Sequence, residues 1–243
     1  MDKKIVITGG TSGIGYAIYK ALTRLNNSEN NKIVILARHS SQKKALFLKD
    51  TLLIDVDISV KKDVELAEKK AMEFLGKIDI LINNAGITFP SSFIKKTKDE
   101  IERTISVNLL GPIYVTHSFL PHLSRQMNSI IVNITSAAGE TGIPGLSVYS
   151  AAKFGLKGFS EALRKEVAEK NIRLIDISPG GVDTPIHNTL VARKGKDSVN
   201  MEYALNPEDV AEAVVYAINQ PPNTSIHELK IRHSSLKMIG TYI

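Results

Sequence analysis

The sequence predicts an α/β protein with a doubly wound parallel sheet. Short apolar runs alternate with helix-length segments, and the runs are apolar throughout rather than at every second residue. Such runs are typical of strands buried on both faces, and parallel neighbours need crossover connections, which are usually helical. A single domain over residues 1–243 is expected, because this length suits one domain and no linker interrupts the pattern.

The expected elements follow in order along the chain. Strands are expected at residues 4–8, 32–37, 77–82, 129–134 and 172–177, with a weaker candidate at 226–231. Helices are expected at residues 13–25, 60–75, 97–126, 148–170 and 207–219. Residues 185–205 lack either pattern, and a loop of that length in a compact domain is usually functional, so we interpret it as a lid rather than an inert insertion.

Composition narrows the classes of function. The chain has no cysteine, which excludes disulfides and thiolate chemistry, and its histidines show no metal-binding spacing, so no metal site is expected. No apolar stretch approaches the roughly 20 residues that cross a bilayer. The amino terminus runs directly into the first strand without a signal-like apolar region, so we expect a cytoplasmic protein that does not bind membranes. The net charge of +6 comes from lysine pairs interleaved with acids, which favours a solvated surface over nucleic-acid binding.

A glycine-rich turn follows the first strand, in Thr8-Gly9-Gly10-Thr11-Ser12-Gly13-Ile14-Gly15. Glycines let the backbone turn tightly and approach a pyrophosphate, whose charge the amino terminus of the following helix favours. In doubly wound sheets, ligands bind outside the carboxyl ends of the strands. The turn therefore predicts a dinucleotide site, although a strand-to-helix turn also needs glycine for its geometry alone.

The second strand ends in Ala37-Arg38-His39-Ser40. An NAD site usually places an acid there to bind the ribose hydroxyls. Arg38 can instead pair with a phosphate that an acid would repel. NADP(H) is therefore favoured over NAD(H), with a plain surface arginine as the alternative.

Tyr149 and Lys153 lie four positions apart in a segment of helical character, so they share one helical face. A tyrosine that titrates near neutrality needs about 4 kcal/mol of preferential stabilisation of its phenolate, which a neighbouring ammonium and a positively charged nicotinamide can supply. Ser136 precedes Tyr149 by thirteen positions at the end of a strand, where its hydroxyl can hold a substrate oxygen. A structural tyrosine–lysine pair is the alternative. No Gly-x-Ser-x-Gly elbow surrounds Ser136, so a hydrolase is not expected.

In combination, these motifs resemble the short-chain dehydrogenase/reductase family. The residues that carry the resemblance are Thr8-Gly9-x-x-x-Gly13-x-Gly15, Asp57-Ile58, Asn83-Asn84-Ala85-Gly86, Asn108, Ser136, Tyr149-x-x-x-Lys153 and Pro179-Gly180-Gly181-Val182-Asp183-Thr184. They span nearly the whole chain, and they imply a Rossmann-like fold.

The resemblance also implies the roles of individual residues. The catalytic residues would be Asn108, Ser136, Tyr149 and Lys153, with Asn108 helping to hold a water that links Lys153 to solvent. A helix cap or bend beside Gly111-Pro112 is the alternative for Asn108. The cofactor would contact Gly9, Thr11, Ser12, Gly13, Ile14, Gly15, Arg38, Asp57, Ile58, Asn84, Ala85, Gly86, Tyr149, Lys153, Pro179, Gly180, Val182 and Thr184.

The implied protein is an NADP(H)-dependent oxidoreductase that transfers a hydride between nicotinamide and a carbonyl or secondary alcohol of a small molecule. A homodimer or homotetramer packed through residues 97–126 and 148–170 is implied as well. The carboxyl end lacks the glycine-rich finish of many relatives, which makes a dimer the stronger expectation. The alternatives are an NAD(H)-dependent alcohol dehydrogenase of the same family, an isomerase or dehydratase that keeps its dinucleotide bound, and a non-catalytic dinucleotide-binding regulator.

Overall fold

The computed structural model describes residues 3–24, 31–186 and 204–235. Within them, seven strands form one parallel sheet in the order β3-β2-β1-β4-β5-β6-β7. The strands are β1 (Lys4–Thr8), β2 (Lys32–Ala37), β3 (Thr51–Asp55), β4 (Ile80–Asn83), β5 (Ile130–Ile134), β6 (Arg173–Pro179) and β7 (Glu228–Ile231). The main helices are α1 (Gly13–Arg24), α2 (Lys61–Leu75), α3 (Lys98–Ile105), α4 (Gly111–Leu123), α5 (Ser147–Val167) and α7 (Pro207–Ile218).

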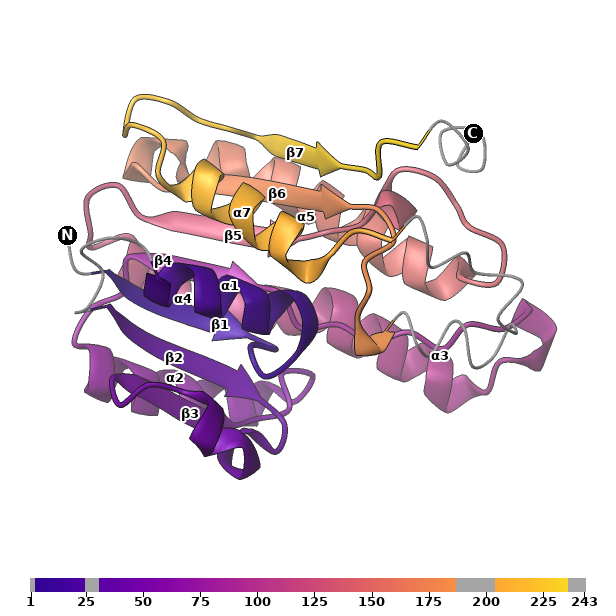
Figure 1. Ribbon diagram of the computed structural model, residues 1–243, viewed down its shortest axis with the longest axis horizontal. Helices are drawn as coiled ribbons and strands as arrows, with labels where there is room; N and C mark the ends of the chain where they lie inside the picture. Colours follow the sequence, from indigo (N-terminus) through magenta and orange to yellow (C-terminus); the bar gives the residue numbers. More distant parts are fainter. Residues whose placement is uncertain (1–2, 25–30, 187–203, 236–243) are drawn as a thin grey trace.

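The sheet is covered on both faces (Figure 1). Helices α1 and α7 pack on one face, and α2, α4 and α5 pack on the other. In β1, Ile5 and Ile7 enter the first core while Val6 enters the second. Successive strand side chains point to opposite faces, so a strand covered on both sides must be apolar throughout. The predicted doubly wound, Rossmann-like sheet is confirmed.

Two expectations about the elements were wrong. The segment 97–126 is not one helix: a π-helical segment at Ser106–Leu110 separates α3 from α4. Strand β3 was not expected, because its sequence Thr51–Asp55 is short and lies at the edge of the sheet, where only Ile54 is buried. The expected strands at 77–82 and 226–231 are present but shorter, as β4 and β7.

A row of buried polar side chains crosses the sheet near its carboxyl edge. Asn83, Asn133 and Asp176 are neighbours in register on β4, β5 and β6. The Asn83 amide donates to Asn133 (2.9 Å), Asn133 donates to the Ser160 hydroxyl (2.9 Å), and that hydroxyl donates to Asp176 (2.7 Å). Burial raises the pKa of Asp176 to about 6, although Ser160 and Arg164 favour its charged form. The row fixes how the strand ends that carry the site lie relative to one another.

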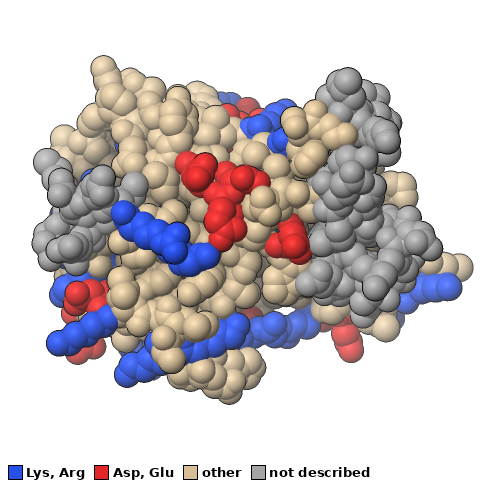
Figure 2. All heavy atoms as spheres, viewed as in Figure 1, with Lys and Arg blue, Asp and Glu red and all other residues tan. Residues whose placement is uncertain are grey.

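The face of the molecule over α1 and α7 carries both signs of charge (Figure 2). Glu208 and Asp209 lie in the first turn of α7, and Glu208 pairs with Lys20 of α1 at 2.8 Å. No helix among the described residues is long and apolar enough to cross a membrane.

Candidate active site

A cleft of about 400 Å³ runs along the carboxyl ends of the strands. It begins beside Arg38 and Asp57, passes the glycine-rich turn, and reaches Tyr149 and Lys153. Strand β1 lies between β2 and β4, so the connections from β1 leave in opposite directions and open a crevice there. All the residues expected to bind the cofactor or act in catalysis line this cleft, with the exceptions of Gly15 and Asn108.

Gly15 and Gly9 let the glycine-rich turn pack closely against the loop after β4. A Cβ on Gly15 would lie 2.4 Å from the side-chain nitrogen of Asn84, and one on Gly9, whose φ is +67°, would lie 2.8 Å from the Cα of Ala85. The Asn84 side chain donates to the backbone carbonyls of Thr8 (3.0 Å) and Gly9 (3.1 Å). The glycines therefore let the β1 turn and the loop after β4 touch, which brings two predicted cofactor-binding segments together.

The amino terminus of α1 opens into the cleft through Thr11, Ser12 and Gly13. No acidic residue occupies the first turn of α1, so its partial positive charge is not neutralised there. The ammonium of Lys43 donates to the Thr11 carbonyl at 3.2 Å. Lys43 was not predicted as a site residue, and its place in a pair of lysines gave no signal in the sequence.

Arg38 and His39 are exposed at the opening of the cleft, directly after β2. His39 has a left-handed backbone (φ +53°) and begins a short 3-10 helix at Ser40–Leu46. Asp57 lies nearby on the same cleft. Burial alone would raise the pKa of Asp57, but hydrogen bonds from Ser59 and the charges of Arg103 and Arg38 lower it below its usual value.

Ser136, Tyr149 and Lys153 meet at the other end of the cleft. The Ser136 and Tyr149 side chains are hydrogen-bonded, and the Lys153 ammonium lies 5.7 Å from the centre of the Tyr149 ring. Lys153 is buried and donates to the Ile134 carbonyl at 2.9 Å. Burial raises the pKa of Tyr149 to about 12 and lowers that of Lys153 to about 8. A phenol, an amine and a hydroxyl therefore share one end of the cleft, as their spacing predicted.

Asn108 is fully buried in the π-helical segment and does not line the cleft. Its side chain accepts from the Ile87 amide (3.1 Å) and donates to the Ile87 carbonyl (2.9 Å) and the Thr104 carbonyl (2.8 Å). A Cβ on Gly86 would lie 2.9 Å from its oxygen. Asn108 thus holds the loop after β4 against α3, and this tertiary contact accounts for its position inside a helix.

The end of β6 and the segment that follows it form part of the cleft wall. Pro179, Gly180, Val182 and Thr184 line it, and the Gly180 amide donates to the Ile231 carbonyl at 2.8 Å. The lid expected at residues 185–205 falls mostly on 187–203, which lie outside the described residues. The apolar side chains Val107, Ile143 and Leu146 also line the cleft, and of these sequence reasoning had not singled out Val107.

The parallel sheet, the glycine-rich turn at the point where the strand order reverses, and the cleft along the strand ends place the chain among the Rossmann-like α/β proteins. The sequence model described as short chain dehydrogenase matches residues 3–195. The chain belongs to this family and is an oxidoreductase of it.

Its relatives cover almost its whole length. An uncharacterized oxidoreductase of Staphylococcus saprophyticus is 36% identical over 244 residues, covering 96% of this chain and 97% of the relative. The structure of a 3-ketoacyl-(acyl-carrier-protein) reductase from Brucella melitensis in complex with NADH has a TM-score of 0.84 at 29% identity, covering 96% of this chain and 97% of its own. A serine dehydrogenase in complex with NADP+ has a TM-score of 0.85 at 27% identity, with 94% of both chains covered.

Proposed function

We propose that this protein is an NADP(H)-dependent oxidoreductase whose single domain, residues 1–243, interconverts a carbonyl and a secondary alcohol of a small molecule. The observation that supports this most is the continuous cleft that joins the glycine-rich turn and Arg38 to the Ser136, Tyr149 and Lys153 group. A dinucleotide needs a binding surface of this kind, with phosphate contacts at one end and proton-transfer groups at the other.

The residues present fit a dinucleotide. Glycines 9 and 13 have positive φ values, and the first turn of α1 is free of acids, which suits a pyrophosphate. No acid follows β2, while Arg38 and Lys43 supply positive charge beside Ser12, which suits a 2′-phosphate. Asp57 and Ile58 would border the adenine, and Thr184 the nicotinamide side. When bound, the nicotinamide supplies or accepts the hydride.

Tyr149 is the proton donor and acceptor in this proposal. Because burial keeps its pKa near 12, the free protein holds the protonated phenol, which is the form that can donate to a carbonyl oxygen. Ser136, bonded to Tyr149, holds that oxygen in place. The charge of Lys153 favours the phenolate that remains after donation.

Asn108 supports this arrangement by fixing Ile87 and Gly86 at the cleft wall. Because its side chain is already bonded to the backbone, it acts on the loop rather than on the substrate. We retain as part of the proposal the role that the family resemblance implies, in which Asn108 helps to hold a water that links Lys153 to solvent.

The proposed assembly is a homodimer or homotetramer in the cytoplasm, packed through residues 97–126 and 148–170, which contain α3, α4 and α5. Phe154 supports this, because it is 47% exposed on α5 although it is large and apolar. Sedimentation of the purified protein would measure the assembly directly.

The decisive experiment follows NADPH and NADH oxidation over a panel of ketones and aldehydes with the wild type, Tyr149→Phe and Tyr114→Phe. Tyr114 lies on α4 away from the cleft and serves as the matched control. Tyr149→Phe should reduce turnover by about 10²–10⁴-fold and leave cofactor binding nearly intact. A wild type that binds cofactor without turnover on the panel would favour the non-catalytic regulator.

A further inference from the structure

A cluster of charged side chains lies behind the active site and outside the cleft. Glu140 accepts hydrogen bonds from the Ser178 hydroxyl, from the Arg232 guanidinium (2.9 Å) and from the Lys230 ammonium (3.1 Å). Arg232 also donates to the backbone carbonyls of Ser178 and Ile231. The contacts between Glu140 and Arg232 connect residues 92 positions apart in the chain.

The cluster joins three segments that each border the site. Glu140 directly follows the 3-10 turn η4 (Ala137–Gly139), whose N-cap is Ser136. Ser178 directly precedes Pro179 and Gly180, which line the cleft. Arg232 directly follows β7, the edge strand of the sheet.

The η4 turn, which Glu140 directly follows, contacts both Ser136 and Lys153, and we call it the Ser136 turn. The Ser136 side chain accepts from the Ala138 amide at 3.1 Å and is bonded to Tyr149. Gly139 packs against Lys153 so closely that a Cβ there would lie 2.9 Å from the Lys153 carbonyl oxygen. A shift of this turn would therefore move both groups that contact Tyr149.

Glu140 is partly buried, and the two residues that follow it, Thr141 and Gly142, are exposed. Burial alone would raise the pKa of Glu140, but the contacts with Ser178, Lys230 and Arg232 lower it below its usual value. The carboxylate is therefore charged at neutral pH, and its cationic partners within the described part of the chain, Lys230 and Arg232, come from the end of the β7 strand.

We propose that Glu140 and Arg232 are positioning residues that hold the Ser136 turn against the ends of β6 and β7. Neither residue lines the cleft, so their effect reaches the reaction through Ser136 and Lys153. This inference rests on the proposed function only where it predicts a change in kcat; the structural part, that Glu140 holds the turn, does not depend on it.

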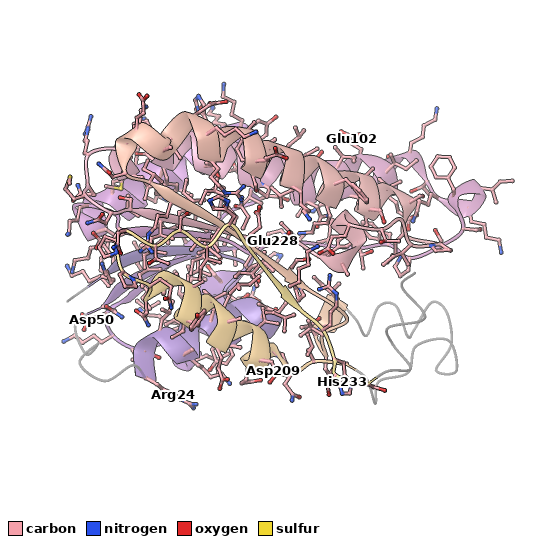
Figure 3. The ribbon with its side chains drawn as sticks, turned by 90° about the horizontal axis from the view of Figure 1, so that it is seen from above. Arg24, Asp50, Glu102, Asp209, Glu228 and His233 are labelled. Carbon is pink, nitrogen blue, oxygen red and sulfur yellow. The ribbon has the colours of Figure 1, made fainter. Side chains whose placement is uncertain are left out.

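The kinetic test compares Glu140→Gln with Lys157→Met. Lys157 of α5 pairs with Glu228 of β7 at 2.7 Å, so it also ties an edge strand to the fold, and it reaches Glu140 only indirectly, through Glu228 and Lys230 (3.9 Å). Figure 3 labels Glu228 on β7, which runs between α5 and α7. Glu140→Gln should lower kcat about tenfold or more, since small misplacements of a catalytic group are costly, with KM for cofactor and substrate within about twofold. Lys157→Met should leave kcat within about twofold.

A second readout does not depend on turnover. In the cofactor-free protein, hydrogen exchange of the amides at residues 138–141 should become about tenfold faster in Glu140→Gln and stay unchanged in Lys157→Met. If Glu140→Gln does not fold, Arg232→Lys tests the same contact, because it keeps the charge and loses the fork that reaches Ser178 and Ile231.

The outcomes separate the two proposals. Unchanged hydrogen exchange in a folded Glu140→Gln overturns the proposal that Glu140 holds the Ser136 turn. Faster exchange with unchanged kcat overturns the proposal that this contact affects catalysis. A wild type that oxidises neither cofactor with any substrate defeats the proposed function, while the exchange result still decides whether Glu140 holds the turn.

Discussion

Replacing Arg38 with alanine tests the cofactor preference most directly. Arg38 is exposed at the end of the cleft, and it lies close enough to Asp57 to lower the pKa of that carboxyl. A guanidinium there would contact the 2′-phosphate that distinguishes NADPH from NADH. Arg38→Ala should therefore weaken NADPH binding and leave NADH binding little changed.

The expected magnitude follows from the exposure of Arg38. A charge-assisted hydrogen bond contributes about 1.5–3 kcal/mol, and solvent exposure favours the lower end of that range. At about 1.4 kcal/mol per tenfold, the NADPH dissociation constant should rise about tenfold, and at most about a hundredfold. Lys43, bonded to the Thr11 carbonyl, should still attract the 2′-phosphate in Arg38→Ala. The double variant Arg38→Ala/Lys43→Ala should therefore bind NADPH more weakly than Arg38→Ala.

Calorimetric titration of both cofactors into the wild type, Arg38→Ala and Arg125→Ala provides the assay. Arg125 is exposed and lies outside the cleft, so its replacement controls for the change in net charge. Ala37→Asp should move the preference further towards NADH, by attracting ribose hydroxyls and repelling phosphate. Equal wild-type affinity for NADH and NADPH, or an equal loss of both in Arg38→Ala, would refute the assignment.

Three further predictions concern the site and the sheet. Lys153→Met removes an ammonium 5.7 Å from the centre of the Tyr149 ring; at an effective dielectric constant of about 20 its attraction for the phenolate is worth about 3 kcal/mol, so kcat at pH 7, where Lys153 is charged, should fall about a hundredfold. An unchanged kcat would contradict that coupling. Gly9→Ala should lower the free energy of unfolding by about 1–3 kcal/mol because its φ is positive, whereas Gly142→Ala, with nothing within 4 Å of a Cβ, should change it little in urea denaturation. Burial raises the pKa of Asp176 from 3.8 to about 6, so the folded state binds its proton more tightly and stability falls as pH rises from about 4 to about 6. Asp176→Asn should remove up to about 3 kcal/mol of that fall, and a parallel pH dependence of wild type and variant would contradict the raised pKa.

Sequence reasoning was most successful where the chemistry is local. The strands are apolar throughout because both faces are covered, and this pattern is visible in β1, β2 and β5 without any knowledge of their neighbours. Tyr149 and Lys153 lie one helical turn apart, so their proximity follows from helix geometry alone.

It was less successful where a tertiary contact overrides local preference. The segment 97–126 is interrupted by the π-helical turn Ser106–Leu110, in which Asn108 bonds to the backbone of Ile87, 21 positions away, and which Gly111-Pro112 directly follows. Strand β3 is half-buried at the edge of the sheet and lacks the long apolar run that marks the central strands. Neither outcome is encoded in periodicity.

The sequence by itself determined the fold class and the family and identified many of the residues that line the cleft, because these depend on apolar periodicity and on glycine, tyrosine and lysine at short, fixed spacings. The tertiary structure alone decided which distant side chains support them. Lys43 reaches Thr11 across 32 positions, and Glu140 reaches Arg232 across 92. Such pairs form only when the sheet brings the ends of separate strands together, and no spacing along the chain records that approach.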